Sequence, residues 1–472
     1  MTAVGMYGNI HTGTGERMEI TEYKSAEEEA MEVLELRKRA RSLHVSTEDE
    51  EVKAYLRHLN EPAILFGEDP ASRRLRLQMF LTKNNLPASR LSLESAKNKE
   101  SGVSQNENTV WYHQGPDSLQ TARMWIAEYS LLRTKERLEK AKQYFSSVPE
   151  SQRKAKLNEH HKNQRSLCLH GSQIGDTRPI VHCSFSPNGE ALATASWSGL
   201  CRVWEVPSME PISTYRGHTS NASCIVWHPR STIDQSRTGI NLASSSYDGS
   251  VKLWSLDSEE PLANIEGHAP HRVTRVAFHP SGRFLGTTCH DKSWRLWDLE
   301  QCDEILHQEG HSKAVYDIKF HPDGSLALTS SMDSYARMWD LRTGRCIMFF
   351  EGHLEDCIGV DISDNGVHAL TCSVDNTVRV YDLRHQQPIY VIPSHNSVVS
   401  CAKFEKQRGG YIVTSSFDKT CKIWGHPTWT CLKTLEGHTN RISYVDISPK
   451  EGKYLATCSH DCTFKLWSRE DL

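Results

Sequence analysis

The stretch AVYDIKFHPDGSLALTSSMDSYARMWDL, residues 314–341, contains three runs in which apolar and polar side chains alternate. Alternation with a period of two predicts β-strands with one buried face. Turn-forming residues separate the runs, with Pro322-Asp323-Gly324 after the first and Asp333-Ser334 after the second. The stretch therefore predicts three consecutive strands joined by tight turns.

Similar stretches recur from residue 180 onward. A Gly-His pair comes before most of them, with Ser394-His395 in the corresponding place once, and the histidines follow one another at intervals of 50, 43, 42, 42 and 43 residues. An acid follows each histidine, and an aromatic residue lies six positions after each acid. One more unit precedes these, with Ser198 in the position of the acid and Trp204 in that of the aromatic residue, which makes seven.

This is the WD-repeat pattern, whose period of about 40–45 residues corresponds to four strands per blade. The sequence therefore predicts an all-β, seven-bladed WD40 β-propeller over residues 166–472 with an N-terminal α-helical region. Too few residues follow Trp467 for a fourth strand in the last blade. We expect that strand to come from around Leu167 to Leu169, which would close the ring. The longest interval predicts a surface loop near residues 230–239.

The first third of the chain divides by composition. Residues 1–47 are expected to be partly disordered with one helix over 26–43, and residues 48–92 form a docking module with a helix over 48–59. Residues 93–110 are interpreted as a polar linker and residues 111–165 as a helical arm. The arm's long helix, ending near Phe145, is expected to be capped by Asp117 or Ser118.

Composition narrows the classes of function. A net charge of −4 gives no global attraction to nucleic acid, so contact with RNA would need a local patch. No signal peptide and no run of about 20 apolar residues is found, so we expect no membrane partner and read the 14 cysteines as reduced thiols.

Each full repeat offers a histidine, a serine and an aspartate, the residue types of a catalytic triad. Because the set recurs around a ring beside an aromatic residue, a structural hydrogen-bond relay to the indole N–H is the better interpretation. We therefore predict no enzyme, no catalytic residue, no cofactor and no metal. The predicted relay residues are His218, Asp248 and Trp254 in the second blade, and His438, Ser459, Asp461 and Trp467 in the seventh.

Large residues stand just before the second tight turn of six blades. Exposed aromatic residues favour a protein interface, and partial burial against neighbouring blades is the alternative. A lysine or arginine lies two positions before the aromatic residue of each repeat. For these bases, pairing with acids inside the propeller is favoured over an RNA-binding ring. The candidate interface residues are Trp197, Tyr247, His290, Met332, Phe417 and His460.

The segment EPAILFGEDPASRRLRL, residues 61–77, combines an apolar knot with a basic helix that Asp69 can cap and Pro70 can start. It resembles the splicing-factor motif of the Prp4-type WD-repeat family of the U4/U6 small nuclear ribonucleoprotein. The resemblance extends to WYHQGPDSLQTARMWIAEYSL from Trp111, to SQIGDTRPI before the first blade, and to SGRFLGTTCHDKSWRLWDLE and HLEDC within the propeller.

The resemblance implies a nuclear, non-enzymatic scaffold of the U4/U6 and U4/U6.U5 small nuclear ribonucleoproteins that acts in pre-mRNA splicing. Its implied partners are a Prp3-type subunit, docked on the propeller, a spliceosomal cyclophilin, U4/U6 snRNA held directly or indirectly, and U5 components. The residues matched to the family's cyclophilin-binding segment are Leu65, Phe66, Gly67, Arg73 and Arg74. The alternatives are a WD40 substrate receptor or signalling adaptor unrelated to RNA, and direct binding of single-stranded RNA by the propeller face.

Overall fold

The computed structural model describes residues 39, 43, 45–46, 48–59, 61–65, 68–84, 116–385, 387–406, 409–449 and 452–469. It contains two compact units. One holds residues up to Leu59 together with Glu68–Gly102, and the other holds Asn60–Gly67 together with Val103–Leu472. The expected helix over 26–43, except Arg39 and Leu43, and the expected linker over 93–110 lie outside the described residues.

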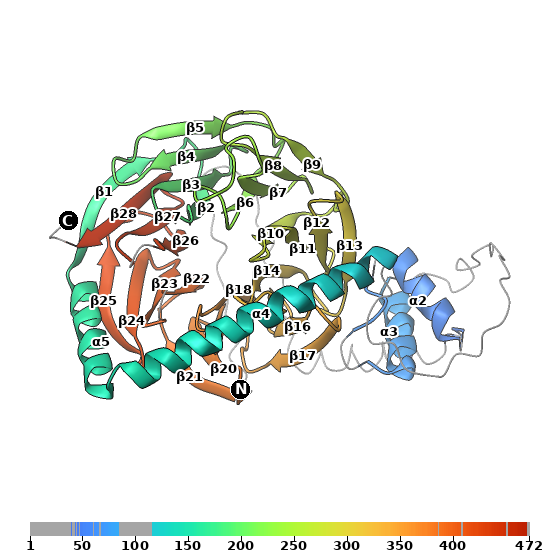
Figure 1. Ribbon diagram of the computed structural model, residues 1–472. Coiled ribbons are helices and arrows are strands. Elements are labelled where there is room, and N and C mark those ends of the chain that lie inside the picture. The colour runs from blue at the N-terminus through green and yellow to red at the C-terminus, as the bar shows by residue number, and fades with distance from the viewer. Residues whose placement is uncertain are drawn as a thin grey trace, which may run out of the picture. The chain divides into compact units, whose positions relative to one another are not determined.

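The second unit is a seven-bladed β-propeller, which confirms the predicted fold class (Figure 1). Each blade is a four-stranded antiparallel sheet. The first four blades consist of β2 (Ile180–Phe185), β3 (Ala191–Ser196), β4 (Cys201–Glu205) and β5 (Pro211–Tyr215); β6 (Ala222–Trp227), β7 (Leu242–Ser246), β8 (Val251–Trp254) and β9 (Ala263–Ile265); β10 (Val273–Phe278), β11 (Phe284–Cys289), β12 (Trp294–Asp298) and β13 (Asp303–Gln308); and β14 (Val315–Phe320), β15 (Leu326–Ser331), β16 (Ala336–Asp340) and β17 (Arg345–Phe350).

The last three blades follow the same order. They consist of β18 (Cys357–Ile362), β19 (His368–Ser373), β20 (Thr377–Asp382) and β21 (Gln387–Pro393); β22 (Val399–Phe404), β23 (Tyr411–Ser416), β24 (Thr420–Gly425) and β25 (Thr430–Glu436); and β26 (Ile442–Ile447), β27 (Leu455–Ser459) and β28 (Thr463–Arg469) with β1 (Leu167–Ile174).

The ring is closed by two strands from opposite ends of the propeller sequence. β1 pairs antiparallel with β28, with Leu167 opposite Arg469 and Ile174 opposite Thr463. The seventh blade therefore obtains its fourth strand from the segment that precedes the first blade in the sequence, as predicted. This pairing covers the edge of β28, which would otherwise present unpaired backbone N–H and C=O groups.

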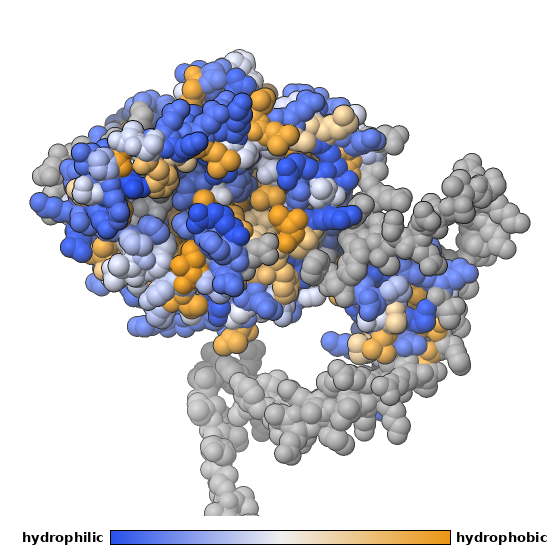
Figure 2. Space-filling model, turned by 60° about the horizontal axis from the view of Figure 1, so that its bottom comes forward, coloured by the Kyte–Doolittle hydropathy of each residue, from blue (hydrophilic) through white to orange (hydrophobic). Residues whose placement is uncertain are grey.

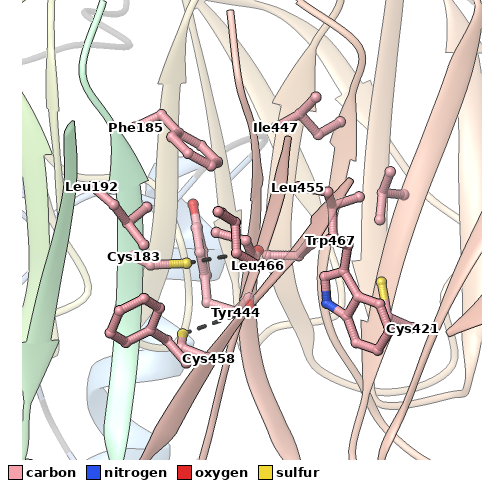
Figure 3. Close-up of a cluster of buried hydrophobic side chains, with 14 of the residues drawn as sticks. Cys183, Phe185, Leu192, Cys421, Tyr444, Ile447, Leu455, Cys458, Leu466 and Trp467 are labelled. Carbon is pink, nitrogen blue, oxygen red and sulfur yellow. Dashed lines mark hydrogen bonds between the residues drawn. The ribbon is translucent and has the colours of Figure 1, made fainter. Parts of the chain in front are cut away.

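The core lies between the blades. The second strand of every blade is buried along nearly its whole length, because each sheet is covered on both faces by its neighbours. Figure 3 shows this packing, with Phe185 and Leu192 of the first blade facing Leu466 of the seventh. The Cys183 and Cys458 thiols donate to backbone carbonyls there, and burial raises the pKa of Cys183 well above its usual value.

Four helices lie before the propeller within the described residues. α2 (Asp49–His58) and α3 (Pro70–Lys83) form a small apolar core in the first unit with Val52, Leu56, Leu77 and Leu81. Asp69 is the N-cap residue of α3 and Pro70 its first residue, although the Asp69 side chain makes no capping hydrogen bond.

α4 (Asp117–Ser147) and α5 (Glu150–Arg165) form the helical arm. The N-cap residue of α4 is Pro116, so the prediction that Asp117 or Ser118 caps this helix was wrong. Proline fits there because its fixed φ and missing N–H cost nothing at a helix start. No helix among the described residues is long and apolar enough to cross a membrane.

α4 crosses one face of the propeller, and α5 lies beside β25 (Figure 1). The crossed face carries the turns that follow the first strand of each blade. Arg137 of α4 donates to Asp323 at 2.7 and 2.9 Å and to the Asn365 carbonyl at 2.6 Å. The arm is thus fastened to its own propeller, which the sequence did not predict. We call this side the helix face.

Candidate functional site

The opposite side of the propeller carries the histidine loops and the turns after the second strands, and we call it the relay face. In the seventh blade, His438 Nδ1 lies 2.8 Å from Asp461 Oδ2, and its Nε2 lies 2.8 Å from the Thr457 hydroxyl. The Trp467 indole donates to the same hydroxyl at 3.0 Å. Although burial alone would raise it, hydrogen bonds from His438 and Thr463 hold the pKa of Asp461 below its usual value.

Ser459 does not belong to this relay, so the sequence assigned the hydroxyl to the wrong residue. Its Oγ instead donates to the carbonyl of Arg441 at 2.9 Å and accepts the Asp461 N–H at 3.2 Å, which shapes the turn. The missed signal is a spacing: the hydroxyl donor or acceptor lies ten residues before each tryptophan, as Thr457 does before Trp467. Thr457 and Ser459 are two positions apart on β27 and therefore lie on the same face of the sheet, but only Thr457 reaches the Trp467 indole.

The ten-residue spacing also holds in the second blade. The Trp254 indole donates to the Ser244 hydroxyl at 2.8 Å, and His218 Nε2 lies 2.7 Å from that hydroxyl. Asp248 is less tightly placed, since its nearest carboxylate oxygen lies 3.8 Å from His218 Nδ1. The same chain of acid, histidine and hydroxyl is present in Asp333–His311–Thr329, Asp375–His353–Thr371 and Asp418–His395–Thr414.

The first blade contains an inverted version of the relay. Asp176, in the GD of SQIGDTRPI, occupies the position of the histidine, and the Ser198 hydroxyl, in the acid position, donates to it. The Trp204 indole donates to Thr194 at 2.9 Å as in the other blades. The acid that appeared to be missing from this blade is therefore supplied from upstream.

The third blade has a break in the relay. His268 Nε2 lies 3.0 Å from Thr287, but its buried Nδ1 has no hydrogen-bond partner among the described residues. Asp291 instead binds Ser293 and Arg295, with the guanidinium at 3.0 Å. The break therefore lies between histidine and acid, while Cys289 occupies the position of Ser459 and not that of the relay hydroxyl.

His268, Cys289 and Asp291 also form the one group within the described part of the chain whose ligand atoms are close enough to hold a metal ion. Two features oppose a divalent cation there. Burial raises the pKa of the Cys289 thiol to about 12, and the positive charge of Arg295 already pairs with Asp291. We assign this group to the structural network.

The six candidate interface residues occupy equivalent positions on the relay face. Each is half-buried, and each backbone N–H donates across to a carbonyl just before the blade's first strand, at 3.0 Å in every case. Several also pack on their neighbours: the rings of Trp197 and His460 lie edge to face at 4.9 Å, and Arg441 lies over Phe417. These residues are Trp197, Tyr247, His290, Met332, Phe417 and His460, with Val374 in the seventh position.

Leu354 is an apolar residue of the relay face that the sequence interpretation missed. It follows His353 in the HLEDC stretch, its N–H donates to Asp375, and its side chain is 88% exposed. A leucine directly after a relay histidine was the available signal. Its side chain is exposed, whereas that of the preceding histidine is buried.

The bases near the key aromatics are used inside the propeller. Arg295 binds Asp291 and Glu304, and Arg337 and Arg202 lie 3.9 and 3.7 Å from the acids Asp333 and Asp176. Three others donate to carbonyl or hydroxyl oxygens, namely Arg379 to Gly352, Lys422 to Ser394 and Lys465 to Ser172. Three of the seven bases thus lie near acids, which supports the predicted pairing for them, and three more bond to other oxygens within the propeller.

Residues 61–65 of the N-terminal motif lie on the propeller. The backbone N–H of Ala63 donates to Glu309 at 2.8 Å, and Lys292 binds Glu61 at 2.6 Å. Pro62 and Ala63 are buried and Leu65 is half-buried. Lys292 belongs to the turn that carries His290, so the start of the motif is seated on the relay face of the third blade.

Arg73 and Arg74 of α3 differ in their surroundings. Arg73 is buried and binds Asp49 of α2 and Glu68, which ties the two helices together. Arg74 is half-buried. Phe66 and Gly67, the other two motif residues proposed to bind a partner, lie outside the described residues.

The central channel opens on the helix face into a cavity of about 780 Å³. It is lined by Phe185, Trp227, Phe278 and Phe320 from four blades, with Arg133 of α4 at its edge. Deeper in the channel, the buried cations are paired: Arg275 donates to the Ser223 carbonyl, and Lys403 lies over the ring of Tyr444 and near Asp361.

Seven consecutive segments match the family model described as WD domain, G-beta repeat, and together they cover more than half of the chain. The chain therefore belongs to the WD40-repeat family. The matched segments are residues 156–205, 209–255, 259–298, 302–340, 344–382, 386–425 and 429–468. Residues 52–78, which end within α3, match a second model, described as pre-mRNA processing factor 4 (PRP4) like.

The chain is also similar to named splicing proteins. It is 53% identical over 227 residues to the U4/U6 small nuclear ribonucleoprotein Prp4 of Homo sapiens, which covers 48% of this chain and 43% of the relative. It is 30% identical over 244 residues to U4/U6 small nuclear ribonucleoprotein PRP4 of Saccharomyces cerevisiae, covering 52% and 51%. The chain thus spans about half the length of the curated relatives it matches.

Proposed function

We propose that this chain is a non-enzymatic scaffold component of the spliceosomal U4/U6 and U4/U6.U5 ribonucleoproteins, and that it works in the nucleus. The observation that carries the proposal is the pairing of a PRP4-like motif over residues 52–78 with seven WD40 repeats, in a chain 53% identical over 235 residues to the U4/U6 small nuclear ribonucleoprotein Prp4 of Pongo abelii. A WD40 adaptor without RNA would have no reason to carry that motif.

The use of the titratable residues supports a binding role over an enzymatic one. Histidines and acids on the relay face stand in pairs whose remaining atoms bond to hydroxyls and turn N–H groups, as in His438 and Asp461. A triad would need a nucleophilic hydroxyl open to substrate. Here Thr457 is buried and accepts from an indole, so the histidine and the acid serve the stability of the blade.

We assign the two partners to different sets of residues. The Prp3-type subunit docks on the relay face, where half-buried aromatics and the exposed Leu354 supply apolar anchors of the kind found at interface centres. The cyclophilin docks on the motif through Leu65, Phe66, Gly67 and Arg74. Arg73 acts differently from the sequence-based proposal: because it is buried between Asp49 and Glu68, it positions α3 and is not itself a contact.

The experiment is a pull-down of the tagged chain from nuclear extract that identifies both bound proteins and small RNAs. We expect U4, U6, a Prp3-type protein and a cyclophilin. Phe66→Ala with Arg74→Glu should remove the cyclophilin alone, while Lys83→Glu, at the exposed end of the same helix, should remove nothing. Recovery of a ubiquitin ligase or signalling complex without small nuclear RNA would reject the splicing assignment.

A second variant pair tests the relay face. Leu354→Asp with Phe417→Ala should remove the Prp3-type protein and keep the cyclophilin. Ile212→Asp, an exposed apolar residue on an outer strand, is the matched control. If RNA binding by the purified chain persists without partner proteins and falls steeply with salt, the propeller binds RNA directly instead.

A further inference from the structure

Figure 2 shows apolar side chains gathered in separate patches on one face of the molecule. An ordered set of exposed apolar residues lies on α4. Met124, Leu131, Leu138 and Phe145 follow one another at intervals of seven residues and are 61%, 62%, 55% and 63% exposed. Arg153 of α5 lies over one face of Phe145. We call these four residues the α4 stripe.

The propeller does not cover this stripe. α4 buries Leu119, Ala122 and Ile126 against the third and fourth blades. At about 100° per residue, Leu131 lies roughly 140° around the helix from Ile126, and Met124 lies roughly 160° from it. The stripe is therefore on the side of α4 turned away from the surface that holds the helix.

The spacing indicates the form of the missing partner. Apolar residues at seven-residue intervals drift by only about 20° per step, which is the geometry of two helices wound around each other. The stripe spans about 32 Å of helix at 1.5 Å per residue, enough for several turns of a partner. Small side chains at Ala127 and Ala141, three positions after Met124 and Leu138, would let a second helix approach closely, while Thr134, between them, bonds to Asp323 of the propeller.

Charges beside the stripe indicate the partner's chemistry. The row four positions after the stripe residues contains Glu128, Lys135 and Lys142, all exposed. Neither lysine forms an ion pair with any residue that the structure describes. A partner helix with acids facing these two lysines would form interhelical salt bridges with them. They lie at the flanking positions whose charges select the partner in coiled coils.

We propose that the α4 stripe is a docking surface for an amphipathic helix of another protein, with apolar residues at seven-residue intervals and an acidic flank facing Lys135 and Lys142. This surface is distinct from the relay face and the N-terminal motif. It stands on the geometry of α4 and goes beyond the splicing role, so either proposal can fail alone.

The test uses the full chain and a synthetic peptide probe of four heptads, with Leu at positions a and d and Glu at e and g. Such a peptide repels its own copies. In fluorescence anisotropy, we expect saturable binding of the acidic peptide and about tenfold weaker binding of the same peptide with Lys at e and g. Leu131→Glu with Leu138→Glu should weaken binding of the acidic peptide by about tenfold or more.

Two controls keep the result interpretable. Ile233→Glu changes a 66% exposed apolar residue in the second-blade loop and should leave binding unchanged. Lys135→Glu with Lys142→Glu should reverse the preference between the two peptides while circular dichroism and thermal unfolding stay the same. Equal binding of both peptides, or binding that survives the leucine changes, overturns the proposal. A wild-type dimer in sedimentation that the leucine changes dissociate would assign the stripe to a second copy instead.

Discussion

At the scale of single residues, stability on the relay face depends on hydroxyls that serve two partners. Thr457 accepts from the Trp467 indole and bonds to His438, so one side chain joins two strands and a loop. A buried donor left without an acceptor costs its full desolvation energy, which makes this hydroxyl more important than its size suggests.

Replacing Thr457 with valine should therefore destabilise the propeller. The shape is kept, but the indole N–H and the histidine nitrogen lose their partner, at a cost of about 1–3 kcal/mol in the free energy of unfolding. Urea unfolding followed by tryptophan fluorescence measures this. Thr457→Ser keeps the hydroxyl and should recover most of the loss; equal losses in both variants would mean that packing of the methyl group, not the hydroxyl, matters.

Arg73 gives a second prediction at this scale. Arg73→Met leaves the carboxylates of Asp49 and Glu68 with fewer cationic partners in a partly buried site, and removing one member of such a pair costs about 3 kcal/mol. Hydrogen exchange in α2 and α3 should speed up while exchange in the propeller stays unchanged. Arg74→Met is the matched control, and identical exchange in the two variants would contradict the structural role of Arg73.

At the scale of elements, α4 is held by few but specific contacts. Leu119, Ala122 and Ile126 supply the apolar contact near its start, and Arg137 supplies a bidentate ion pair to Asp323 near its middle. Although burial alone would raise it, the hydrogen bonds from Arg137 and Thr134 hold the pKa of Asp323 below its usual value. The last third of α4, after Arg137, is mostly exposed, so its position depends on this pair and on α5.

Arg137→Met should loosen the last third of α4 without unfolding the blades. The bonds to Asp323 and to the Asn365 carbonyl are lost together, and amide exchange after residue 137 should rise by about tenfold or more, equivalent to about 1.4 kcal/mol. Lys135→Met, two residues away on the exposed side, should have little effect. Unchanged exchange in Arg137→Met would place the attachment of the arm elsewhere.

At the scale of the whole molecule, the propeller is a ring whose integrity depends on one seam. β1 joins β28 over eight residues, and Leu167 at its start is buried with Tyr411 and Trp467 in the largest core cluster. A break at this seam would open the ring and leave the edges of β1 and β28 without partners.

Leu167→Ala should therefore cost about 2–5 kcal/mol of unfolding free energy, the range for a buried leucine. Leu169→Ala, on the same strand but 45% exposed, should cost clearly less. Guanidinium unfolding of the two variants makes the comparison. Equal small effects would show that the seam adds little to the stability of the ring.

Stability should also depend on pH because many histidines are buried. Burial lowers the pKa of His279 to about 4, with the Gly324 carbonyl opposing the shift in part. Burial also lowers the pKa of His426 and of His460 to about 4. An unfolded histidine binds a proton near pH 6.5. The unfolded chain thus holds more protons between pH 4 and 6.5, and stability falls as the pH drops through that window.

The carboxylates act in a lower window. Burial alone would raise the pKa of Asp333, but hydrogen bonding to His311 lowers it to about 2. The contribution of Asp333 to folding stability is therefore present above about pH 4 and is lost as the pH falls toward 2. Thermal unfolding should therefore be flat above about pH 7, decline from pH 6.5 to 4, and decline further below. A midpoint unchanged between pH 7.5 and 5 would contradict the contribution of the histidines.

The sequence by itself determined the number of blades, the closing strand and the family, because the same local pattern of residues occurs seven times in the sequence. Turn residues, alternating strands and an aromatic residue six positions after each acid are local signals. These signals predict the fold correctly because each blade makes the same contacts as the others. The long helix of the arm was predictable in the same way, from Leu119, Ala122, Ile126, Tyr129 and Leu132 at helical spacing; the first three are buried, whereas Leu132 is 67% exposed.

Only the tertiary structure decided which residues meet across blades and loops. It moved the relay hydroxyl from Ser459 to Thr457, supplied Asp176 to the first blade, and seated Glu61 and Ala63 on the third. Such pairings depend on the distance between side chains that lie far apart in the chain, and no local period encodes that distance. The same reason explains why the exposed stripe on α4 could be recognised only once its other side was seen to be buried.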